Sequence, residues 1–240
     1  MRRDEADVFT PEPLLATPWP APFSVERVIE VLEPLVLEPR RARLLQVIGD
    51  RLQSVTLVMD APHDPHNGAA VLRSADAFGV QSVHIVPRSE SFLVSANVAK
   101  GTERWVDVTT HPTAESAIGA LRQQAYRLVA THPEGRLVPD DLATIPRVAL
   151  VMGNEHDGIS EALARAADDS VRIPMRGFVE SLNVSVSAAV LLAFATRGRS
   201  GDLGRTAQRL LYARGLYRTV KRAEEVLDAS APRAGAAGAK

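Results

Sequence analysis

The chain has 240 residues, 45% of them hydrophobic and 24% charged, and its formal net charge of −1 is typical of a globular protein rather than of a uniformly basic nucleic-acid binder. The absence of cysteine excludes a disulfide framework, a thiolate zinc site and a cysteine nucleophile. No apolar run approaches the roughly 20 residues of a membrane span, and the N-terminus lacks the apolar core of a signal peptide, so we expect a cytoplasmic protein with no membrane partner.

The N-terminal part of the sequence predicts a tail and a helical extension. Residues 1–22 are rich in proline and predict a tail without fixed structure. Residues 23–53 carry apolar positions at helical spacing and predict two short helices. The second of these helices is expected to open with a cluster of three arginines, Arg40, Arg41 and Arg43.

The central part, residues 54–198, alternates short runs of Val, Ile and Leu with longer amphipathic segments. The apolar runs predict strands at 54–59, 82–86, 105–109, 126–131, 147–152 and 171–175. The segments between them predict helices at 67–78, 112–124, 158–168 and 181–197, the first with Asn67 and the last with Ser181 as N-cap. Because buried strands alternate with helices, the predicted fold class is α/β, an open parallel sheet with helices on both faces.

The C-terminal part is basic although the whole chain is not. Residues 197–222 hold eight Lys or Arg against one Asp, whereas residues 1–39 hold three Arg against eight Asp or Glu. Residues 199–228 predict a basic extension of one or two helices, weakened at Gly215, and residues 229–240 predict a second tail without fixed structure. A basic stripe is typical of a phosphate-binding surface, and a solvated helix face is the alternative.

The segment "DAPHDPHNGAAVLRSADAFGV" (60–80) follows the first predicted strand. The two aspartates and two histidines of residues 60–66 resemble metal ligands, but two prolines force a loop there and no third histidine stands nearby, so we expect no metal. Further on, Arg73 stands among apolar neighbours in the predicted helix, where its guanidinium must reach a partner or water. A surface salt bridge is the alternative to a functional role for this arginine.

The segment "VMGNEHDGIS" (151–160) joins a predicted strand to a helix. Gly153 and Gly158 have the spacing of a phosphate loop, but Ile159 stands where that loop needs lysine, which excludes a nucleoside triphosphate site. The sequence also lacks the glycine fingerprint of a dinucleotide site. What remains is a tight glycine turn at the carboxyl end of a strand, where open α/β sheets bind ligands. Glu155 in this turn is either a solvated acid or a ligand contact.

In the segment "IPMRGFVESLNVSVSAAV" (173–190), the start of a predicted apolar helix contains four polar residues, Ser181, Asn183, Ser185 and Ser187. A buried polar group without a partner costs on the order of 1–3 kcal/mol. Serine hydroxyls bond readily to the carbonyls of their own helix, which accounts for two of the four. It accounts poorly for the asparagine.

The stretches "PHNGAAVLRSADAFGV", "VMGNEHDGIS" and "IPMRGFVESLNVSVSAAV" together resemble the three ordered signature motifs of the SPOUT-class RNA ribose methyltransferases. The resemblance is closest to the TrmH branch, the tRNA guanosine 2′-O-methyltransferases, and extends from about Ser54 to Arg197. It implies a homodimer whose sheet ends in a deep trefoil knot, one of the exceptions to the rule that chains do not thread loops.

The resemblance also implies the residues of the site. It implies S-adenosylmethionine, held in a bent shape mainly by backbone groups, at Thr131, Gly153, Ile173, Met175 and Leu182. It implies a catalytic arginine at Arg73 positioned by Asn67, with the site completed, partly from across the homodimer, by Glu155, Ser181 and Asn183.

Transfer of a methyl group to a ribose hydroxyl is an in-line displacement that needs proximity, orientation and removal of a proton, and it needs no metal. Arginine is a difficult base, because the guanidinium stays protonated in proteins. Arg73 is therefore either a base activated by an RNA phosphate or a hydrogen-bond donor to hydroxyl and phosphate. In the second case a phosphate or water accepts the proton.

The implied substrate is tRNA, with a D-loop guanosine as the methylated nucleotide and no DNA partner. Phosphate contacts are expected from five arginines, Arg40, Arg41, Arg43, Arg205 and Arg209. We expect tRNA because no separate N-terminal RNA-binding domain of the kind found in ribosomal-RNA relatives is recognisable. The alternatives are the same reaction on ribosomal RNA, a non-catalytic RNA-binding module, and a methyltransferase for small molecules.

Overall fold

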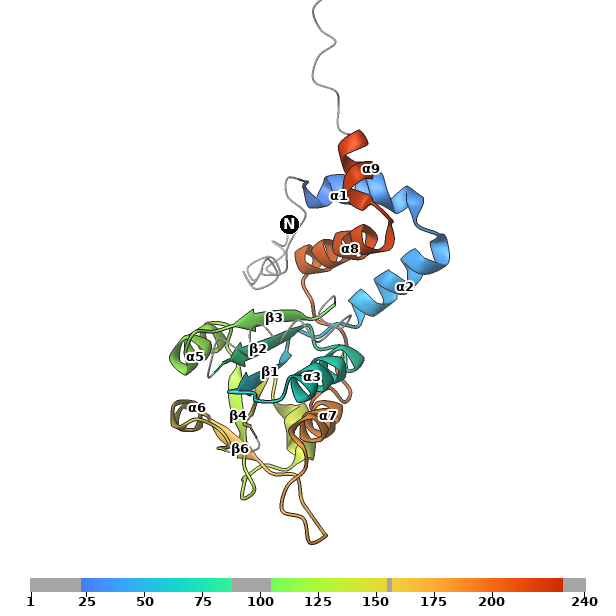
Figure 1. Ribbon diagram of the computed structural model, residues 1–240. Coiled ribbons are helices and arrows are strands. Elements are labelled where there is room, and N and C mark those ends of the chain that lie inside the picture. Colours follow the sequence, from blue (N-terminus) through green and yellow to red (C-terminus); the bar gives the residue numbers. More distant parts are fainter. Residues whose placement is uncertain (1–22, 88–104, 155–156, 231–240) are drawn as a thin grey trace, which may run out of the picture. The chain divides into compact units, whose positions relative to one another are not determined.

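The computed structural model describes residues 23–87, 105–154 and 157–230 (Figure 1). The predicted tail of residues 1–22 lies outside these residues, as does nearly all of the second predicted tail. The described residues form two compact units, a sheet unit of residues 50–202 and a helical unit that combines residues 23–49 with 203–230. Among the described helices, none is long and apolar enough to cross a bilayer.

The sheet unit is built on six parallel strands in the order β3-β2-β1-β5-β4-β6. The strands are β1 (Val55–Asp60), β2 (Ser82–Val86), β3 (Asp107–Thr110), β4 (Arg127–Thr131), β5 (Val148–Met152) and β6 (Asp169–Val171). The predicted α/β class with an open parallel sheet is confirmed. The strand predicted at 171–175 was wrong, since β6 ends at Val171, and Pro174 beyond it has no N–H for a ladder.

Helices cover both faces of this sheet, as predicted. Successive residues of the central strands point to opposite faces, so that Leu57 and Leu150 enter one core while Val58 and Val151 enter the other. The first core is shared with α3 and α7, which pack against each other, and with η6; the second is shared with α5 and α6 (Figure 1). These helices are α3 (Pro65–Ala77), α5 (Ala114–Gln123), η6 (Pro139–Thr144), α6 (Glu161–Ala166) and α7 (Val184–Ala195).

Two helices begin at residues other than the predicted caps. The N-cap of α3 is Asp64, whose carboxylate accepts from the His66 N–H at 2.8 Å, and Pro65 follows at the first helical position. A proline there has its φ angle already set for a helix, which moves the start before the predicted cap Asn67. The N-cap of α7 is Asn183 and not Ser181. Asn67 and Ser181 therefore do not cap these helices.

A pair of histidines is buried beside strands β2 and β3. His84 Nδ1 and His111 Nε2 lie 2.8 Å apart, and the two rings are stacked. Burial, together with the neighbouring His111, lowers the pKa of His84 to about 3, and burial also lowers the pKa of His111. Both rings are thus neutral in the folded protein near neutral pH.

The end of the sheet unit is fixed by side chains after α7. Arg199 donates to the Pro146 carbonyl at 2.8 Å and to the Ser54 hydroxyl at 3.2 Å. Asp202 accepts from the Ser54 N–H at 3.1 Å. These bonds attach residues 199–202 to the start of β1, so the chain leaves the sheet unit only after Asp202.

The helical unit joins the two flanking segments of the sequence. Its elements are α1 (Val25–Leu32), η3 (Glu33–Leu35), α2 (Glu38–Gly49), α8 (Arg205–Thr219) and α9 (Ala223–Ala229). Helix α8 packs against both α1 and α2 and runs without a break through Gly215. A Cβ at Gly215 would lie 3.0 Å from a methyl carbon of Leu44, so this glycine permits the close approach of α8 to α2.

Candidate active site

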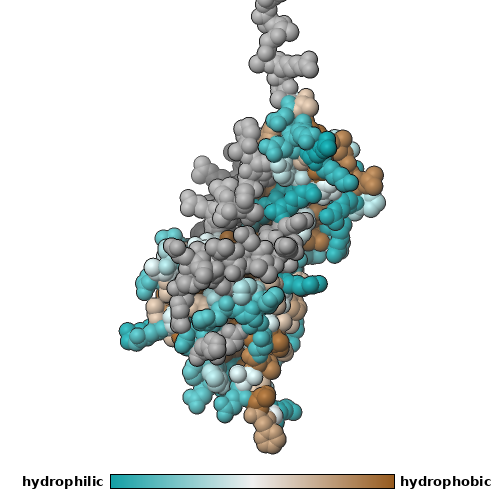
Figure 2. Space-filling view, in the orientation of Figure 1, coloured by the Kyte–Doolittle hydropathy of each residue, from teal (hydrophilic) through white to brown (hydrophobic). Residues whose placement is uncertain are grey.

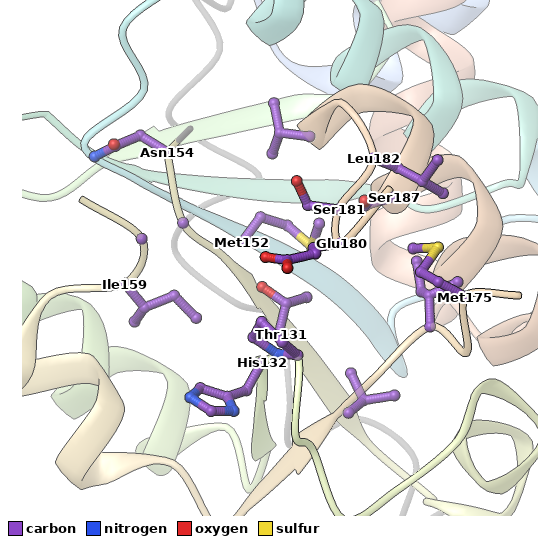
Figure 3. Close-up of a pocket in the computed structure, with 16 residues that line it drawn as sticks. Thr131, His132, Met152, Asn154, Ile159, Met175, Glu180, Ser181, Leu182 and Ser187 are labelled. Atoms are coloured by element: carbon purple, nitrogen blue, oxygen red, sulfur yellow. The ribbon is translucent and has the colours of Figure 1, made fainter. Parts of the chain in front are cut away.

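A cavity of about 360 Å³ lies at the carboxyl ends of β4, β5 and β6, where an open α/β sheet is expected to bind ligands (Figure 3). The second and third signature motifs and the end of β4 line it, and the first motif joins them through the hydrogen bond between Asn183 and Asn67. All five residues expected to bind the cofactor line it, namely Thr131, Gly153, Ile173, Met175 and Leu182. The structure thus brings together residues that are separated by up to 51 positions in the sequence.

The glycine turn after β5 forms one wall of the cavity. Asn154 and Gly158 exchange two backbone hydrogen bonds of 3.2 Å, which close the turn. A Cβ at Gly153 would lie 2.3 Å from the Gly158 carbonyl carbon and 2.6 Å from the Ile159 nitrogen, so only glycine fits there. Gly158 has a φ of +69°, a conformation that also favours glycine. Glu155, the predicted acid of this turn, lies outside the described residues.

Asp60 holds the far end of this turn. Its side chain is 3% exposed at the end of β1, and its carboxylate accepts from the Ser160 N–H at 2.5 Å. In the sequence, this acid stands out only as a possible metal ligand. Within the described residues, no group of three or more His, Asp or Glu is placed to hold a metal ion.

The second wall comes from the segment after β4. The Thr131 hydroxyl donates to the Val151 carbonyl at 3.2 Å, and the His132 N–H donates to the Val171 carbonyl at 3.0 Å. A Cβ at Gly135 would lie 2.4 Å from the Val171 carbonyl carbon, so the chain after β4 passes directly against the end of β6. His132 lines the cavity and was missed, because no motif marks it.

The third wall is the loop of residues 172–183, which projects from the sheet unit between β6 and α7 (Figure 1). Its two ends line the cavity, whereas Phe178 at its tip is fully exposed and Val179 is 61% exposed. The projecting end is coloured as hydrophobic in the space-filling view (Figure 2). On the way back to α7 the loop places Glu180 and Ser181 at the cavity, with the Glu180 carboxylate pointing into it (Figure 3).

Asn183 joins the first and third motifs. Its side-chain oxygen accepts from the Ser185 N–H at 2.8 Å and from the Ser185 hydroxyl at 2.6 Å. This leaves its amide nitrogen to donate to the Asn67 side-chain oxygen at 3.1 Å. The asparagine that the sequence could not explain therefore caps α7 and binds α3 as well. Ser187, one turn further, lines the cavity.

Arg73 is exposed on α3, six residues after Asn67, and does not line the cavity. Among the described residues its guanidinium has no hydrogen-bond or ion-pair partner, so the surface salt bridge that was the alternative is not formed there. Within the described residues, Asn183 and Asn67 are bonded beside the edge of the cavity that Ser181 lines, whereas Arg73 is exposed on α3.

The five arginines expected to contact RNA all belong to the helical unit, although the sequence places them in two distant segments. Four of them are exposed, and Arg41 is half-buried and paired with Glu38. Arg209 lies 3.8 Å from Glu26, a separation at which an exposed pair contributes little. Helix α8 itself carries four arginines and no acid.

Comparison with known proteins agrees with this geometry. Residues 54–193 match the model of the SpoU rRNA Methylase family. The chain is 37% identical over 161 residues to the tRNA (guanosine(18)-2'-O)-methyltransferase of Escherichia coli (strain K12), covering 67% of this chain and 70% of that protein.

Two solved structures share the fold. The crystal structure of the A. aeolicus TrmH/SpoU tRNA modifying enzyme matches with a TM-score of 0.64 at 25% identity, over 77% of this chain and 98% of that one. The SpoU methyltransferase AviRb from Streptomyces viridochromogenes, in complex with the cofactor AdoMet, matches with a TM-score of 0.53 at 27% identity, over 62% and 58%. Since the family match spans the whole sheet and all three motifs, this chain belongs to the SpoU rRNA Methylase family.

Proposed function

We propose that this chain transfers a methyl group from S-adenosylmethionine to the ribose 2′-hydroxyl of a D-loop guanosine in tRNA. The observation that carries this proposal is that the second and third motifs line one cavity, while Asn183 of the third is bonded to Asn67 of the first. The name of the Escherichia coli relative supports a tRNA guanosine as the substrate. The AviRb complex supports the methyl donor.

The residues around the cavity fit S-adenosylmethionine. The volume of about 360 Å³ lies in the usual range for a small-molecule site, about 300–1,000 Å³. The lining is divided between apolar side chains suited to an adenine ring, such as Ile159 and Leu182, and hydroxyls suited to polar groups, such as Thr131 and Ser187. The tight glycine turn presents backbone atoms rather than side chains. When bound, this molecule supplies an electrophilic methyl group on a sulfonium.

The chain's own residues orient the reaction. Asn183 is held at both ends of its amide, so it offers a rigid edge beside Ser181. The guanidinium donors of Arg73 are not used by the described residues and are available to a ribose hydroxyl and an RNA phosphate. We assign Arg73 to holding the hydroxyl for attack, and Glu155 to completing the site.

We propose a homodimer through the face of α7 that the sheet does not cover. Helix α7 is apolar on nearly every side, and a helix of this kind is normally buried all round. Yet Val186 of α7 is 46% exposed, and Leu182, just before the helix, is 36% exposed. A second copy of the chain would cover this apolar surface. It would also supply the Arg73 that the cavity of a single chain lacks.

We propose a trefoil knot in the carboxyl half of the sheet unit. The close passage of Gly135 against Val171 supports it, because the chain beyond β6 must run past the segment after β4 before it reaches α7. We also propose that the arginines of α2 and α8 hold the tRNA backbone, since both helices belong to one unit.

The test is methylation of purified tRNA and ribosomal-RNA transcripts, with the product mapped by mass spectrometry. We expect one methylated ribose, at a D-loop guanosine of tRNA. Arg73→Ala should lower turnover at least about a hundredfold, the scale of one lost transition-state contact, while calorimetry shows unchanged binding of S-adenosylmethionine. Arg165→Ala, an exposed arginine of α6 paired with Glu161, is the matched control. Near-normal turnover of Arg73→Ala, or methylation of ribosomal RNA alone, would contradict the proposal.

A further inference from the structure

The Glu180 carboxylate is a feature of the cavity that the proposed function leaves unexplained. It lies on the returning arm of the 172–183 loop, one residue before Ser181. The side chain lines the cavity, and its carboxylate points inward, toward the side on which Thr131 and Met152 lie (Figure 3). It lies within the third motif, but the site residues expected from the sequence do not include it.

This carboxylate has no partner in the described part of the chain, neither a hydrogen-bond donor nor a cation. Among the described lining residues, Glu180 is also the only acidic one, and none is a lysine or an arginine. The others offer apolar groups, hydroxyls, an amide and the imidazole of His132. A ligand that fills the cavity takes water away from the carboxylate, which is costly unless the ligand brings a positive charge.

We propose that Glu180 determines the preference of this cavity for the charged methyl donor over the spent product, an inference that rests on the proposed function. S-Adenosylmethionine carries a sulfonium, and S-adenosylhomocysteine carries a neutral thioether at the same place. The two molecules are otherwise alike, including their α-ammonium group. A carboxylate that faces the sulfur therefore attracts the first and is indifferent to the second.

The position of Glu180 favours the sulfur over the α-ammonium. Its neighbour Ser181 and the nearby Asn183 stand at the edge where the third motif binds Asn67 of the first. The reacting methyl group must lie near that edge, and the sulfur carries the methyl group. The positive charge disappears when the methyl group is transferred, so the attraction ends with the reaction and the product is released more easily.

This role predicts a split between binding and turnover. The carboxylate stabilises a charge that is present before the reaction and is being lost in the transition state, so it contributes to ground-state binding. Glu180→Gln keeps the size of the side chain and removes its charge. The KM for S-adenosylmethionine should rise, while kcat stays the same or increases.

The experiment is calorimetry of the full chain with three ligands: S-adenosylmethionine, S-adenosylhomocysteine, and sinefungin, whose amine replaces the sulfonium with another cation. In Glu180→Gln we expect the affinity for both cationic ligands to fall by about threefold to tenfold, the range of a partly screened ion pair. The affinity for S-adenosylhomocysteine should change by less than about twofold. Glu134→Gln, an exposed acid on the segment after β4 that does not line the cavity, should leave all three affinities unchanged.

An equal loss for all three ligands would place Glu180 at the α-ammonium and overturn the inference, and so would unchanged affinities in Glu180→Gln. A wild-type chain that binds none of the three would overturn the proposed function itself, a result that is distinct from either. Because Glu180 is exposed and makes no bond to the described residues, the variant is expected to fold normally, and its melting temperature checks this.

Discussion

Substitution of Gly153 by alanine tests how the cavity wall is built. The added Cβ would meet three backbone atoms, at 2.3, 2.5 and 2.6 Å, and no flexible side chain that could move aside. The turn must therefore open and lose the two hydrogen bonds between Asn154 and Gly158. Losing both bonds costs about 2 kcal/mol, and forcing the extra carbon into a packed site costs about 1–3 kcal/mol more.

If the substitution destabilises the closed form of the turn by about 3 kcal/mol, a ligand that binds only this closed form loses affinity by about a hundredfold. Calorimetry of Gly153→Ala with S-adenosylmethionine measures this loss, and urea unfolding shows how much of the cost reaches the whole sheet unit. The matched control is Gly119→Ala in α5, where a Cβ meets nothing within 4 Å. It should stabilise the helix by roughly 0.5–1 kcal/mol and leave affinity unchanged. Wild-type affinity and an unchanged urea midpoint for Gly153→Ala would refute the reasoning.

Three further predictions concern other parts of the molecule. Asp60→Ala removes a charged acceptor from the Ser160 N–H and should weaken S-adenosylmethionine binding by up to about 1.5–3 kcal/mol. Asp60→Asn keeps an acceptor oxygen and should lose less affinity. If calorimetry gives Asp60→Ala the same affinity for S-adenosylmethionine as the wild-type chain, this role of Asp60 is excluded. The pKa of His84 is about 3 in the folded protein and near 6.5 in the unfolded chain. Between these two pH values the unfolded state binds one more proton than the folded state. The free energy of unfolding is therefore unaffected by His84 above pH 6.5 and falls toward pH 3, by up to about 1.4 kcal/mol per pH unit. Urea unfolding of His84→Gln should show a shallower fall between pH 6.5 and 5, and an identical slope would contradict the assignment. Finally, Arg205→Gln combined with Arg209→Gln should reduce the slope of log affinity for tRNA against log salt by about 2, without changing the affinity for S-adenosylmethionine, and an unchanged slope would remove these two residues from the RNA contact.

The sheet could be predicted from the sequence because apolar runs mark buried parallel strands without reference to the rest of the fold. The ends of the elements could not, since they depend on single contacts. The N-cap of α3 is Asp64 because Pro65 follows it, and β6 ends at Val171, before Pro174, which has no N–H for a ladder. The union of residues 23–49 with 203–230 rests on contacts between distant segments, for which no local pattern exists.

The cavity was found through its motifs and not through its chemistry. Its walls are largely backbone and apolar side chains, which look like ordinary loop and core residues in a sequence. Glu180 and Asp60 were missed for this reason, although each had a signal. Glu180 lies within the third motif, directly before Ser181, and Asp60 is the last residue of a buried strand at the ligand-binding edge.

The helical unit has a consequence for the order in which the molecule is assembled. Its first two helices leave the ribosome at the beginning of synthesis, but the surface that buries Leu32 and Leu44 belongs to α8, more than 150 residues later. The sheet unit is encoded entirely between them and has all its strands and helices before α8 emerges. A chain whose synthesis stops before α8 therefore has all the elements of the sheet unit, but its amino-terminal helices still expose their apolar sides, a form suited to capture by chaperones or proteases.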